Sequence, residues 1–199
     1  ALIATGDELV SPGNDLGPDQ IPASNSYGLY ALCAAQGAAP RLLPIARDTP
    51  DHLGAVLDLA VEADLIVTIG GASVGEHDLV QTALRDAGME LDFWRIAMRP
   101  GKPLMFGMID STRMLGLPGN PVSVMATFYQ IVQPALERLT GNADVDPTLR
   151  LEATCESELR KKPGRLEVQR GILRQDSDGG YTVRTTGLQG SGVLSSMGR

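Results

Sequence analysis

The fold is decided by residues 64–78, near the middle of the chain, which read DLIVTIGGASVGEHD. The run from Leu65 to Ile69 is almost entirely apolar, which is typical of a strand buried on both faces of a parallel sheet. Closely spaced glycines then end the run, and a helix to about residue 87 is predicted after them. The stretch therefore predicts a strand, a glycine-rich loop and a helix in succession.

The same order of strand, loop and helix is expected twice before this stretch. Residues 1–5 predict a strand, and residues 24–37 predict a helix that begins with a Ser-Asn cap and ends at a glycine. Residues 41–46 predict a second strand, and residues 49–60 predict a helix that begins with Thr-Pro, a cap followed by a first-turn proline. Three such units in a row indicate an α/β fold with a mostly parallel sheet.

Further elements after the central stretch complete this arrangement. Strands are predicted over 91–97, 104–109 and 113–117, and a final helix over 122–139. The expected architecture is a three-layer α/β/α unit with helices on both faces of the sheet.

The last third of the chain has a different pattern. A polar linker with Gly, Asp and Pro spans residues 140–148. After it, residues 151–156, 165–173 and 181–184 alternate between apolar and polar and are separated by Pro-Gly and Asp-Gly-Gly turns. This pattern predicts a small all-β module.

Composition excludes several classes of protein. The chain has 199 residues, with 24 acidic and 17 basic side chains and a net charge of -7, which argues against a general binder of nucleic acid or of anionic membranes. It contains no apolar run of the length that spans a bilayer. The two cysteines, Cys33 and Cys155, lack metal-site spacing, and so few cysteines favour a reducing cytoplasm as the location.

Carboxylates follow three of the predicted strands. Asp7 and Glu8 follow the first, Asp48 follows the second, and Asp78 ends the glycine-rich loop after the third. Because parallel strands present their carboxyl ends at one edge of a sheet, these side chains are expected at one edge. They would repel one another unless a cation lay between them, and Mg²⁺ takes one or two carboxylates together with phosphate oxygens. The pattern favours a metal-assisted phosphate site, although each acid alone is equally well explained as a turn residue or a helix-dipole partner.

The glycine-rich loop supports a phosphate site. Gly70, Gly71 and Gly75 allow backbone N–H groups to approach an anion, and Ser73 adds a hydroxyl donor. The loop matches neither of the common nucleotide-binding glycine motifs, so taken alone it is only suggestive. Residues 99–103, RPGKP, add two cationic side chains on a loop stiffened by proline.

Several strings in the chain occur together in a known family. They are TGDEL (5–9), GGASVGEHD (70–78), RPGKP (99–103), GLPGNPVS (116–123), GRLEVQRG (164–171) and QGSG (189–192). In this order they resemble the molybdopterin molybdenumtransferases, the family of MoeA and the gephyrin E domain. The resemblance implies a molybdopterin-binding α/β/α domain over residues 1–141 and a small β-barrel domain over residues 142–199.

The resemblance also implies an activity and the residues that carry it. The family inserts molybdenum from molybdate into adenylylated molybdopterin and releases AMP with the help of Mg²⁺. The catalytic and metal-binding residues implied are Glu8, Asp48 and Asp78. Those implied for pterin and phosphate are Asp7, Ser24, Asn25, Gly70, Gly71, Ser73, Gly75, Pro118, Gly119, Asn120 and Pro121. Those implied for molybdate are Arg99, Lys102, Ser123, Arg165, Arg170 and Ser191.

The chain also departs from the family pattern. Ala23 stands where many relatives have an aspartate, and Arg99 stands where many have a lysine, which keeps the charge but changes the donor geometry. The family's two N-terminal subdomains, which form a homodimer and complete the site, are not in this chain. We therefore expect it to be part of a longer, dimeric protein, with the upstream adenylyltransferase as a further partner.

Two other functions are kept as alternatives. One is the adenylyltransferase that acts one step earlier on a similar fold, and the other is a non-catalytic scaffold that binds molybdopterin. Arg165, Arg170 and Ser191 of the predicted β domain favour molybdenum insertion over adenylyl transfer. The three carboxylates argue against a pure scaffold, since a scaffold has no need of them.

Overall fold

A five-stranded sheet forms the middle layer of the computed structural model, which describes residues 1–60, 62–71, 77–142, 149–161 and 163–198. The strands in spatial order are β1 (Leu2–Ala4), β4 (Leu65–Ile69), β8 (Thr112–Leu117), β7 (Met105–Ile109) and β5 (Met89–Phe93). β1, β4 and β8 pair in parallel, and β7 is antiparallel to both of its neighbours. One strand therefore opposes the other four, which confirms the mostly parallel sheet.

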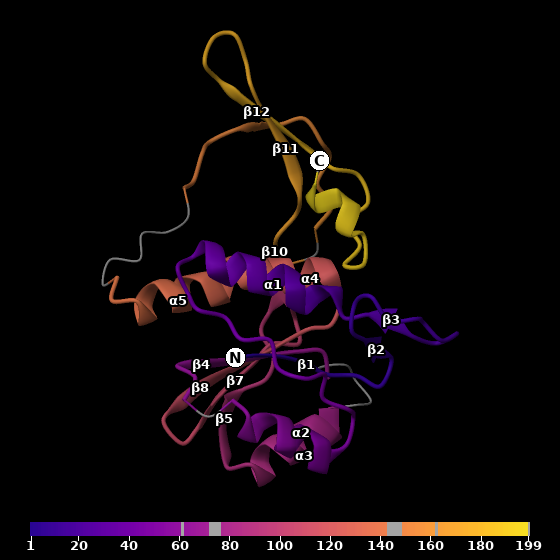
Figure 1. The fold of residues 1–199 in the computed structure, drawn as a ribbon. Coiled ribbons are helices and arrows are strands. Elements are labelled where there is room, and N and C mark those ends of the chain that lie inside the picture. Colours follow the sequence, from indigo (N-terminus) through magenta and orange to yellow (C-terminus); the bar gives the residue numbers. More distant parts are fainter. Residues whose placement is uncertain (61, 72–76, 143–148, 162, 199) are drawn as a thin grey trace.

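Helices cover both faces of this sheet (Figure 1). On one face lie α1 (Ser24–Ala35), α4 (Pro121–Thr127) and α5 (Gln133–Leu139), and on the other lie α2 (Pro50–Asp58) and α3 (His77–Asp86). Each face has its own apolar core, one around Leu29 and Phe128 and the other around Leu53 and Leu84. The three layers agree with the expected α/β/α architecture.

The predicted strand over residues 41–46 is reduced to two isolated bridges beside β1. Leu42 pairs with Leu2, and Ala46 pairs with Thr5, both in parallel. Pro44 lies between the two bridges and has no N–H to donate, so it interrupts the ladder.

The predicted helix over residues 122–139 is continuous but changes its winding. Between α4 and α5 lies η1 (Phe128–Val132), a π-helical segment in which the amide of Gln133 donates to the carbonyl of Phe128. Pro134 follows at once and cannot donate an amide hydrogen. A wider turn next to such a residue is the usual way for a helix to absorb the missing bond.

The described residues after the linker, 149–161 and 163–198, are called here the β unit. Strands β11 (Gly171–Gln175), β12 (Tyr181–Thr185) and β9 (Thr154–Cys155) form an open three-stranded sheet, and η2 (Leu194–Met197) is a 3-10 turn. Because β9 is only two residues long, the ladder ends early, and these residues form no closed barrel. The expected barrel is therefore wrong for the part of the chain that the structure describes.

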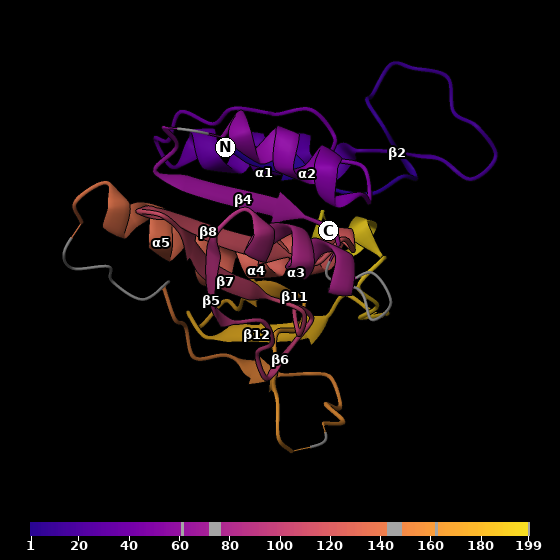
Figure 2. The same cartoon turned by 90° about the horizontal axis from the view of Figure 1, so that it is seen from below.

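Two short strand pairs complete the fold. β10 (Leu166–Glu167) of the β unit pairs in parallel with β6 (Met98–Arg99) of the α/β unit, and β2 (Leu9–Val10) pairs with β3 (Ile21–Pro22). In Figure 2, β6 and β12 both lie beyond the β5 edge of the sheet. The boundary predicted between residues 141 and 142 adjoins a stretch outside the described residues and stays a prediction. Among the described helices, none is long and apolar enough to cross a membrane.

Candidate functional site

A cavity of about 400 Å³ lies at the carboxyl ends of β1 and β4. The first residues of α1 and the loop before α4 complete its wall. We call it the large cavity to distinguish it from the small hollow beside Asp48; two hollows elsewhere on the described chain are larger, at about 490 and 740 Å³. The residues that line the large cavity are Ala4, Thr5, Glu8, Leu9, Ile21, Pro22, Ala23, Ser24, Asn25, Ser26, Ile69, Gly70, Gly71, Gly119, Asn120 and Pro121. Eight of these are predicted site residues: Glu8, Ser24, Asn25, Gly70, Gly71, Gly119, Asn120 and Pro121. Segments far apart in the sequence therefore meet at the carboxyl ends of parallel strands, where ligands of such sheets are expected to bind.

Two glycines shape the wall of the large cavity next to β4. Gly70 has a φ of 98°, and a Cβ there would lie 2.6 Å from the carbonyl oxygen of Thr5. Gly71 has a φ of 65°, and a Cβ there would lie 2.6 Å from Cγ2 of Val80. Neither position accepts a side chain, so the backbone itself forms the wall of the cavity.

One hydrogen bond connects the two helix starts that border the large cavity. Nδ2 of Asn25, in the first turn of α1, donates to the carbonyl oxygen of Gly119 at 2.7 Å. Asn120 precedes the first-turn Pro121 of α4 and makes no side-chain capping bond. Pro118 is buried behind this loop and does not line the cavity.

The predicted acids occupy two neighbouring places. The amide of Asp7 donates to Oδ2 of Asp48 at 3.2 Å, and the amide of Asp48 donates to Oδ1 of Asp7 at 3.3 Å. Nη1 of Arg47 donates to the carbonyl oxygen of Asp7 at 2.9 Å. Glu8 lines the large cavity, whereas Asp48 borders a much smaller hollow beside Thr5. The first two strand exits are thus joined by reciprocal bonds.

One oxygen of the Asp48 side chain, Oδ1, is buried and has no hydrogen-bond partner. A buried carboxylate oxygen without a partner is costly, and a bound cation would satisfy it. Carboxylate oxygens are also the ligands that Mg²⁺ accepts. Glu8 and Asp48 therefore fit a magnesium ion in donor type.

The predicted metal group is only partly described. In residues 1–60, 62–71, 77–142, 149–161 and 163–198, no three His, Cys, Asp or Glu side chains lie close enough together to hold a metal ion. The backbone of Asp78 belongs to α3, but its side chain lies outside the described residues, as do Ser73 and Gly75. The predictions for these three residues stay open.

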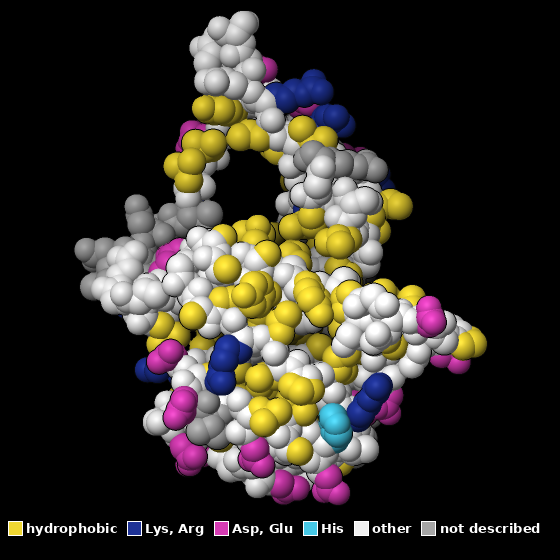
Figure 3. Space-filling model, viewed as in Figure 1, with side chains coloured by type: hydrophobic (Ala, Val, Ile, Leu, Met, Phe, Trp, Pro, Cys, Tyr) yellow, Lys and Arg dark blue, Asp and Glu magenta, His cyan; other side chains and the backbone are white. Residues whose placement is uncertain are grey.

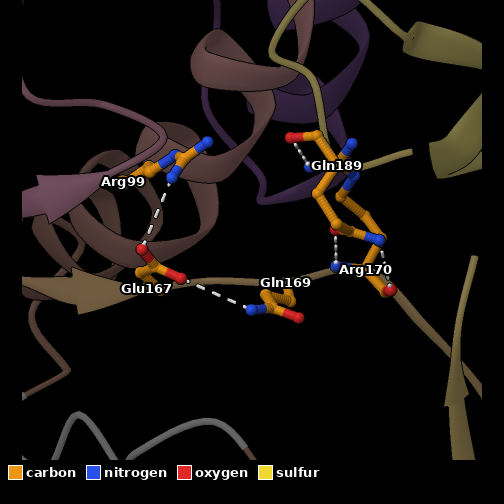
Figure 4. A network of polar contacts seen from close by, with 5 residues as sticks. All are labelled: Arg99, Glu167, Gln169, Arg170 and Gln189. Carbon is orange, nitrogen blue, oxygen red and sulfur yellow. Dashed lines mark hydrogen bonds and ion pairs between the residues drawn. The ribbon is translucent and has the colours of Figure 1, made fainter. Parts of the chain in front are cut away.

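None of the six predicted molybdate-binding residues lines the large cavity. Arg99 is an exposed partner of Glu167, with Nη1 and Oε1 3.7 Å apart, and both line a hollow of about 250 Å³ (Figure 4). Lys102 and Arg165 are exposed, and Ser123 is buried in α4. Ser123 and Ser191 lie close to the wall of the large cavity, because the Ser191 carbonyl accepts the amide hydrogen of Val122, which stands between Pro121 and Ser123.

Arg170 differs from the other predicted cations because its guanidinium N–H groups already donate to acceptors within the described chain. Its Nε donates to Oγ of Ser196 at 2.9 Å, and its two terminal nitrogens donate to backbone carbonyls of residues 188–190. Desolvation lowers the pKa of this guanidinium from its ordinary value. Two partners of these cations, Glu167 beside Arg99 and Gln189 beside Arg170, were not singled out from the sequence, although both lie within strings that carried the resemblance.

The outer surfaces of the two helical layers differ in charge. α1 contains no charged residue, and its exposed side includes Tyr27 and Tyr30, which are 49% and 41% exposed. Figure 3 shows apolar side chains gathered across this middle region and acidic ones concentrated below it, where α2 and α3 lie. An uncharged, aromatic face on a protein of net charge -7 is typical of a protein interface.

Comparison with known proteins gives two family matches. Residues 1–138 match the family described as "Probable molybdopterin binding domain". Residues 152–199 match the family described as "MoeA C-terminal region (domain IV)". Together the two matches cover nearly all of the chain.

Individual relatives agree with these matches. The chain is 36% identical over 197 residues to a molybdopterin molybdenumtransferase of Haemophilus influenzae, covering 98% of this chain and 48% of the relative. It is 42% identical over 147 residues to one of Nostoc sp., covering 72% of this chain and 34% of that protein. A crystal structure of the molybdopterin biosynthesis moeA protein from Pyrococcus horikoshii superimposes with a TM-score of 0.71 at 26% identity, over 98% of this chain and 46% of that one. The chain thus spans about half the length of such relatives, or less.

Proposed function

The chain belongs to the molybdopterin molybdenumtransferase (MoeA) family, and from this premise we propose that it carries the pterin- and molybdate-handling part of an enzyme of molybdenum cofactor biosynthesis. The proposed reaction inserts molybdenum from molybdate into adenylylated molybdopterin and releases AMP. The observation that carries the proposal is the large cavity, in which eight predicted site residues from four chain segments come together.

In this proposal the large cavity holds the adenylylated pterin. Its volume of about 400 Å³ falls in the range of small-molecule sites. Backbone at Gly70 and Gly71 lets phosphate oxygens approach closely, because no side chain stands in the way. Asn25 and Asn120 supply amide groups beside this backbone, since a Cβ on Gly119 would lie only 3.6 Å from Cα of Gly70. The cavity thus offers neutral donors to the ligand, which suits an anion in an acidic protein.

The proposed role of the acids is to hold Mg²⁺ against the phosphates. Glu8 at the cavity wall and the unpaired Oδ1 of Asp48 are the described ligand candidates, and Asp78 is the third. When bound, Mg²⁺ would neutralise charge on the phosphoanhydride and polarise it toward attack by an oxygen nucleophile. Asp7 would act by holding the Asp48 loop through its reciprocal bonds.

Molybdate, a dianion, is proposed to be a substrate that enters from the junction of the two units. Arg99 and Lys102 on the RPGKP loop are the cations assigned to it, and Arg165, Ser123 and Ser191 are further candidates. The Arg99–Glu167 pair is long, at 3.7 Å, and Arg99 remains largely exposed, so the guanidinium is available to an incoming anion.

A single-turnover assay tests the proposed reaction in the full-length protein. Adenylylated molybdopterin, Mg²⁺ and molybdate are mixed with the protein, and AMP release is followed. Molybdate-dependent release is expected. Consumption of ATP with free molybdopterin would instead indicate adenylyl transfer, and pterin binding without any release of AMP would indicate a scaffold.

Two further features of the proposal concern assembly and location. We propose that the uncharged α1 face contributes to a homodimer interface, because an uncharged patch can meet its own copy about a two-fold axis without repulsion. Replacing Tyr30 with Arg should shift the mass measured by light scattering toward the monomer. The free thiols Cys33 and Cys155 are consistent with a reducing cytoplasm.

A further inference from the structure

Asp48 lies in a short turn just before α2, and the amide hydrogens of this turn go to identified acceptors. The amide of Thr49 donates to the carbonyl oxygen of Arg47 at 2.7 Å. The amide of Asp48 donates to Oδ1 of Asp7 at 3.3 Å, and the amide of Arg47 donates to Nδ1 of His52 at 3.1 Å. Two of the three acceptors are therefore side chains. Asp7 already has a role in the proposed function, whereas His52 has none.

The His52 ring acts like one half of a capping box. His52 is the third residue of α2 after the cap Thr49, and its amide donates to Oγ1 of Thr49 at 3.4 Å. In a capping box, the side chain at this position reaches back to the amide of the cap residue. Here the Thr49 amide is already bonded to Arg47, and the ring reaches two residues further back, to the Arg47 amide. The ring therefore ties the first turn of α2 to the chain on the far side of Asp48.

The bonds of this turn decide where the Asp48 carboxylate lies. Its Oδ2 accepts the amide hydrogen of Asp7 at 3.2 Å, and its Oδ1 is the buried oxygen without a partner. Mg²⁺ requires near-ideal octahedral geometry, so a ligand that is free to shift binds it less tightly than one held in place. A bond that limits the freedom of the turn therefore contributes to the affinity for the ion.

His52 can affect the turn without being needed for the fold. The residue is exposed, and it belongs to neither of the two apolar cores. Loss of one hydrogen bond at the surface has little effect on global stability. An effect of His52 on the metal site can therefore be measured in a folded protein.

We propose that His52 is a positioning residue: through Nδ1 it holds the turn that carries Asp48, so that the unpaired Oδ1 of Asp48 is held in position for a magnesium ion. The ring does not bind the ion, and no step of the proposed reaction is assigned to it. This deepens the proposed function and rests on it, because it names a residue that determines the affinity of the proposed magnesium site.

Three variants of the full-length protein separate this hydrogen bond from the other properties of the ring. In His52→Asn, Oδ1 of the new side chain can replace Nδ1 as the acceptor. In His52→Leu, a side chain of similar size has no acceptor. Asp58→Leu, at the exposed end of the same helix, controls for an added apolar side chain at the surface. If His52→Leu does not fold, His52→Ala removes the same acceptor and replaces it.

The first experiment examines the turn without any ligand. Amide hydrogen exchange is followed for the peptide of residues 43–51, whose sequence is the same in the three variants. His52→Leu should speed exchange of the Arg47 amide in this peptide about tenfold, whereas His52→Asn and Asp58→Leu should leave it near the wild-type rate. Unchanged exchange in His52→Leu, or equally fast exchange in His52→Asn, would overturn the proposal, because the bond to the ring would then not hold the turn.

The second experiment measures binding of the metal alone. Mn²⁺ accepts the same oxygen ligands as Mg²⁺, and its binding to the full-length protein is followed by electron paramagnetic resonance. The Kd for Mn²⁺ should rise about tenfold in His52→Leu and stay near the wild-type value in His52→Asn and Asp58→Leu. Asp48→Asn, which removes the ligand itself, should bind least. Equal Kd values in the wild type and His52→Leu, or no binding by the wild type, would overturn the proposal.

The third experiment connects the turn to the reaction. In the AMP-release assay, the Mg²⁺ concentration that gives half the maximal rate should rise about tenfold in His52→Leu. The molybdate KM and the rate at saturating Mg²⁺ should not change. A lower rate at saturating Mg²⁺ with an unchanged Mg²⁺ requirement would overturn the proposal in favour of a direct role in turnover. If the wild type releases no AMP, the proposed function fails, whereas hydrogen exchange and Mn²⁺ binding still decide the role of His52.

Discussion

The two units are stabilised in different ways. The α/β unit, residues 1–142 as far as the structure describes them, is built around an apolar core, whereas the described part of the β unit is held mainly by hydrogen bonds. Every apolar side chain that is buried among the described residues lies between Leu2 and Leu136. The described part of the β unit buries only Thr186 and Ser196, both polar and both next to the Arg170 network. The large cavity has walls of both kinds: its glycine wall rests on the core, and its Gly119–Pro121 wall is bonded to the β unit. Truncation of a buried apolar side chain in residues 1–142 should therefore cost far more stability than truncation of an exposed one in the β unit.

The largest effect is expected from truncation in the core. Phe128 is fully buried in the cluster beneath α1, in edge-to-face contact with Tyr129. Phe128→Ala should lower the free energy of unfolding by about 3–5 kcal/mol, because it leaves a cavity in close-packed surroundings. Leu188→Ala in the β unit, where Leu188 is 80% exposed, should change it by less than about 0.5 kcal/mol. Urea denaturation measures both, and similar losses would mean that the two units are not stabilised differently.

A smaller effect, on activity rather than stability, is expected at Asp48. Asp48→Asn keeps the size and an acceptor for the Asp7 amide but removes the charge that the buried Oδ1 would present to Mg²⁺. AMP release in the full-length protein should fall by about 100-fold or more. Asp51→Asn, an exposed change one turn away on α2, is the control and should have little effect. Unchanged turnover in Asp48→Asn would remove Asp48 from the proposed metal site.

The sequence could predict the elements whose signal is local. Leu65–Ile69 forms the buried strand expected there, and Thr49 caps α2 by accepting the amide of His52, as expected from Thr-Pro. The cap predicted for α1 was wrong in detail: the residue before the helix is Ala23, which makes no side-chain cap. The Ser26 hydroxyl donates instead to the Ala23 carbonyl, a backward bond that the composition of the segment does not reveal.

Hydrogen bonds between distant loops could not be predicted from sequence patterns. Because Asp7 and Asp48 both follow predicted parallel strands, they were expected at one edge of the sheet. Nothing in the sequence indicated that their amides and carboxylates exchange hydrogen bonds across 41 residues. Arg170 shows the same limit more sharply. A conspicuous arginine predicts an anion contact, yet whether its donors face a ligand or carbonyls depends on the path of a loop 18 to 20 residues away. Side-chain type gives the chemistry, and loop conformation decides its partner.

A third prediction isolates the glycine wall of the large cavity. Gly71→Ala should cost about 2 kcal/mol of stability, because the new Cβ would lie 2.6 Å from Val80 and the backbone has a φ of 65°. Gly88→Ala is a matched control: its φ is 84° but its Cβ would meet nothing, so it should cost about 1 kcal/mol, the backbone strain alone. Thermal denaturation compares them. Equal losses would show that Val80 yields to the added methyl group.

The smallest effect expected is a gain in stability, and it tests how strictly the core of the α/β unit excludes unpaired polar atoms. Thr68, in the middle of β4, is fully buried, and its Oγ1 has no hydrogen-bond partner. Thr68→Val replaces that hydroxyl with a methyl group of nearly the same size and should stabilise the fold by about 1 kcal/mol. Thr127 is equally buried, but its hydroxyl bonds the Ser123 carbonyl at 2.8 Å, so Thr127→Val should destabilise by about 1 kcal/mol. Opposite signs from two identical substitutions, read from urea denaturation, would show that satisfaction of the hydroxyl, not burial of the residue, decides the outcome. A loss of stability in both would mean that Thr68 bonds a group, such as a buried water, that stabilises the native strand.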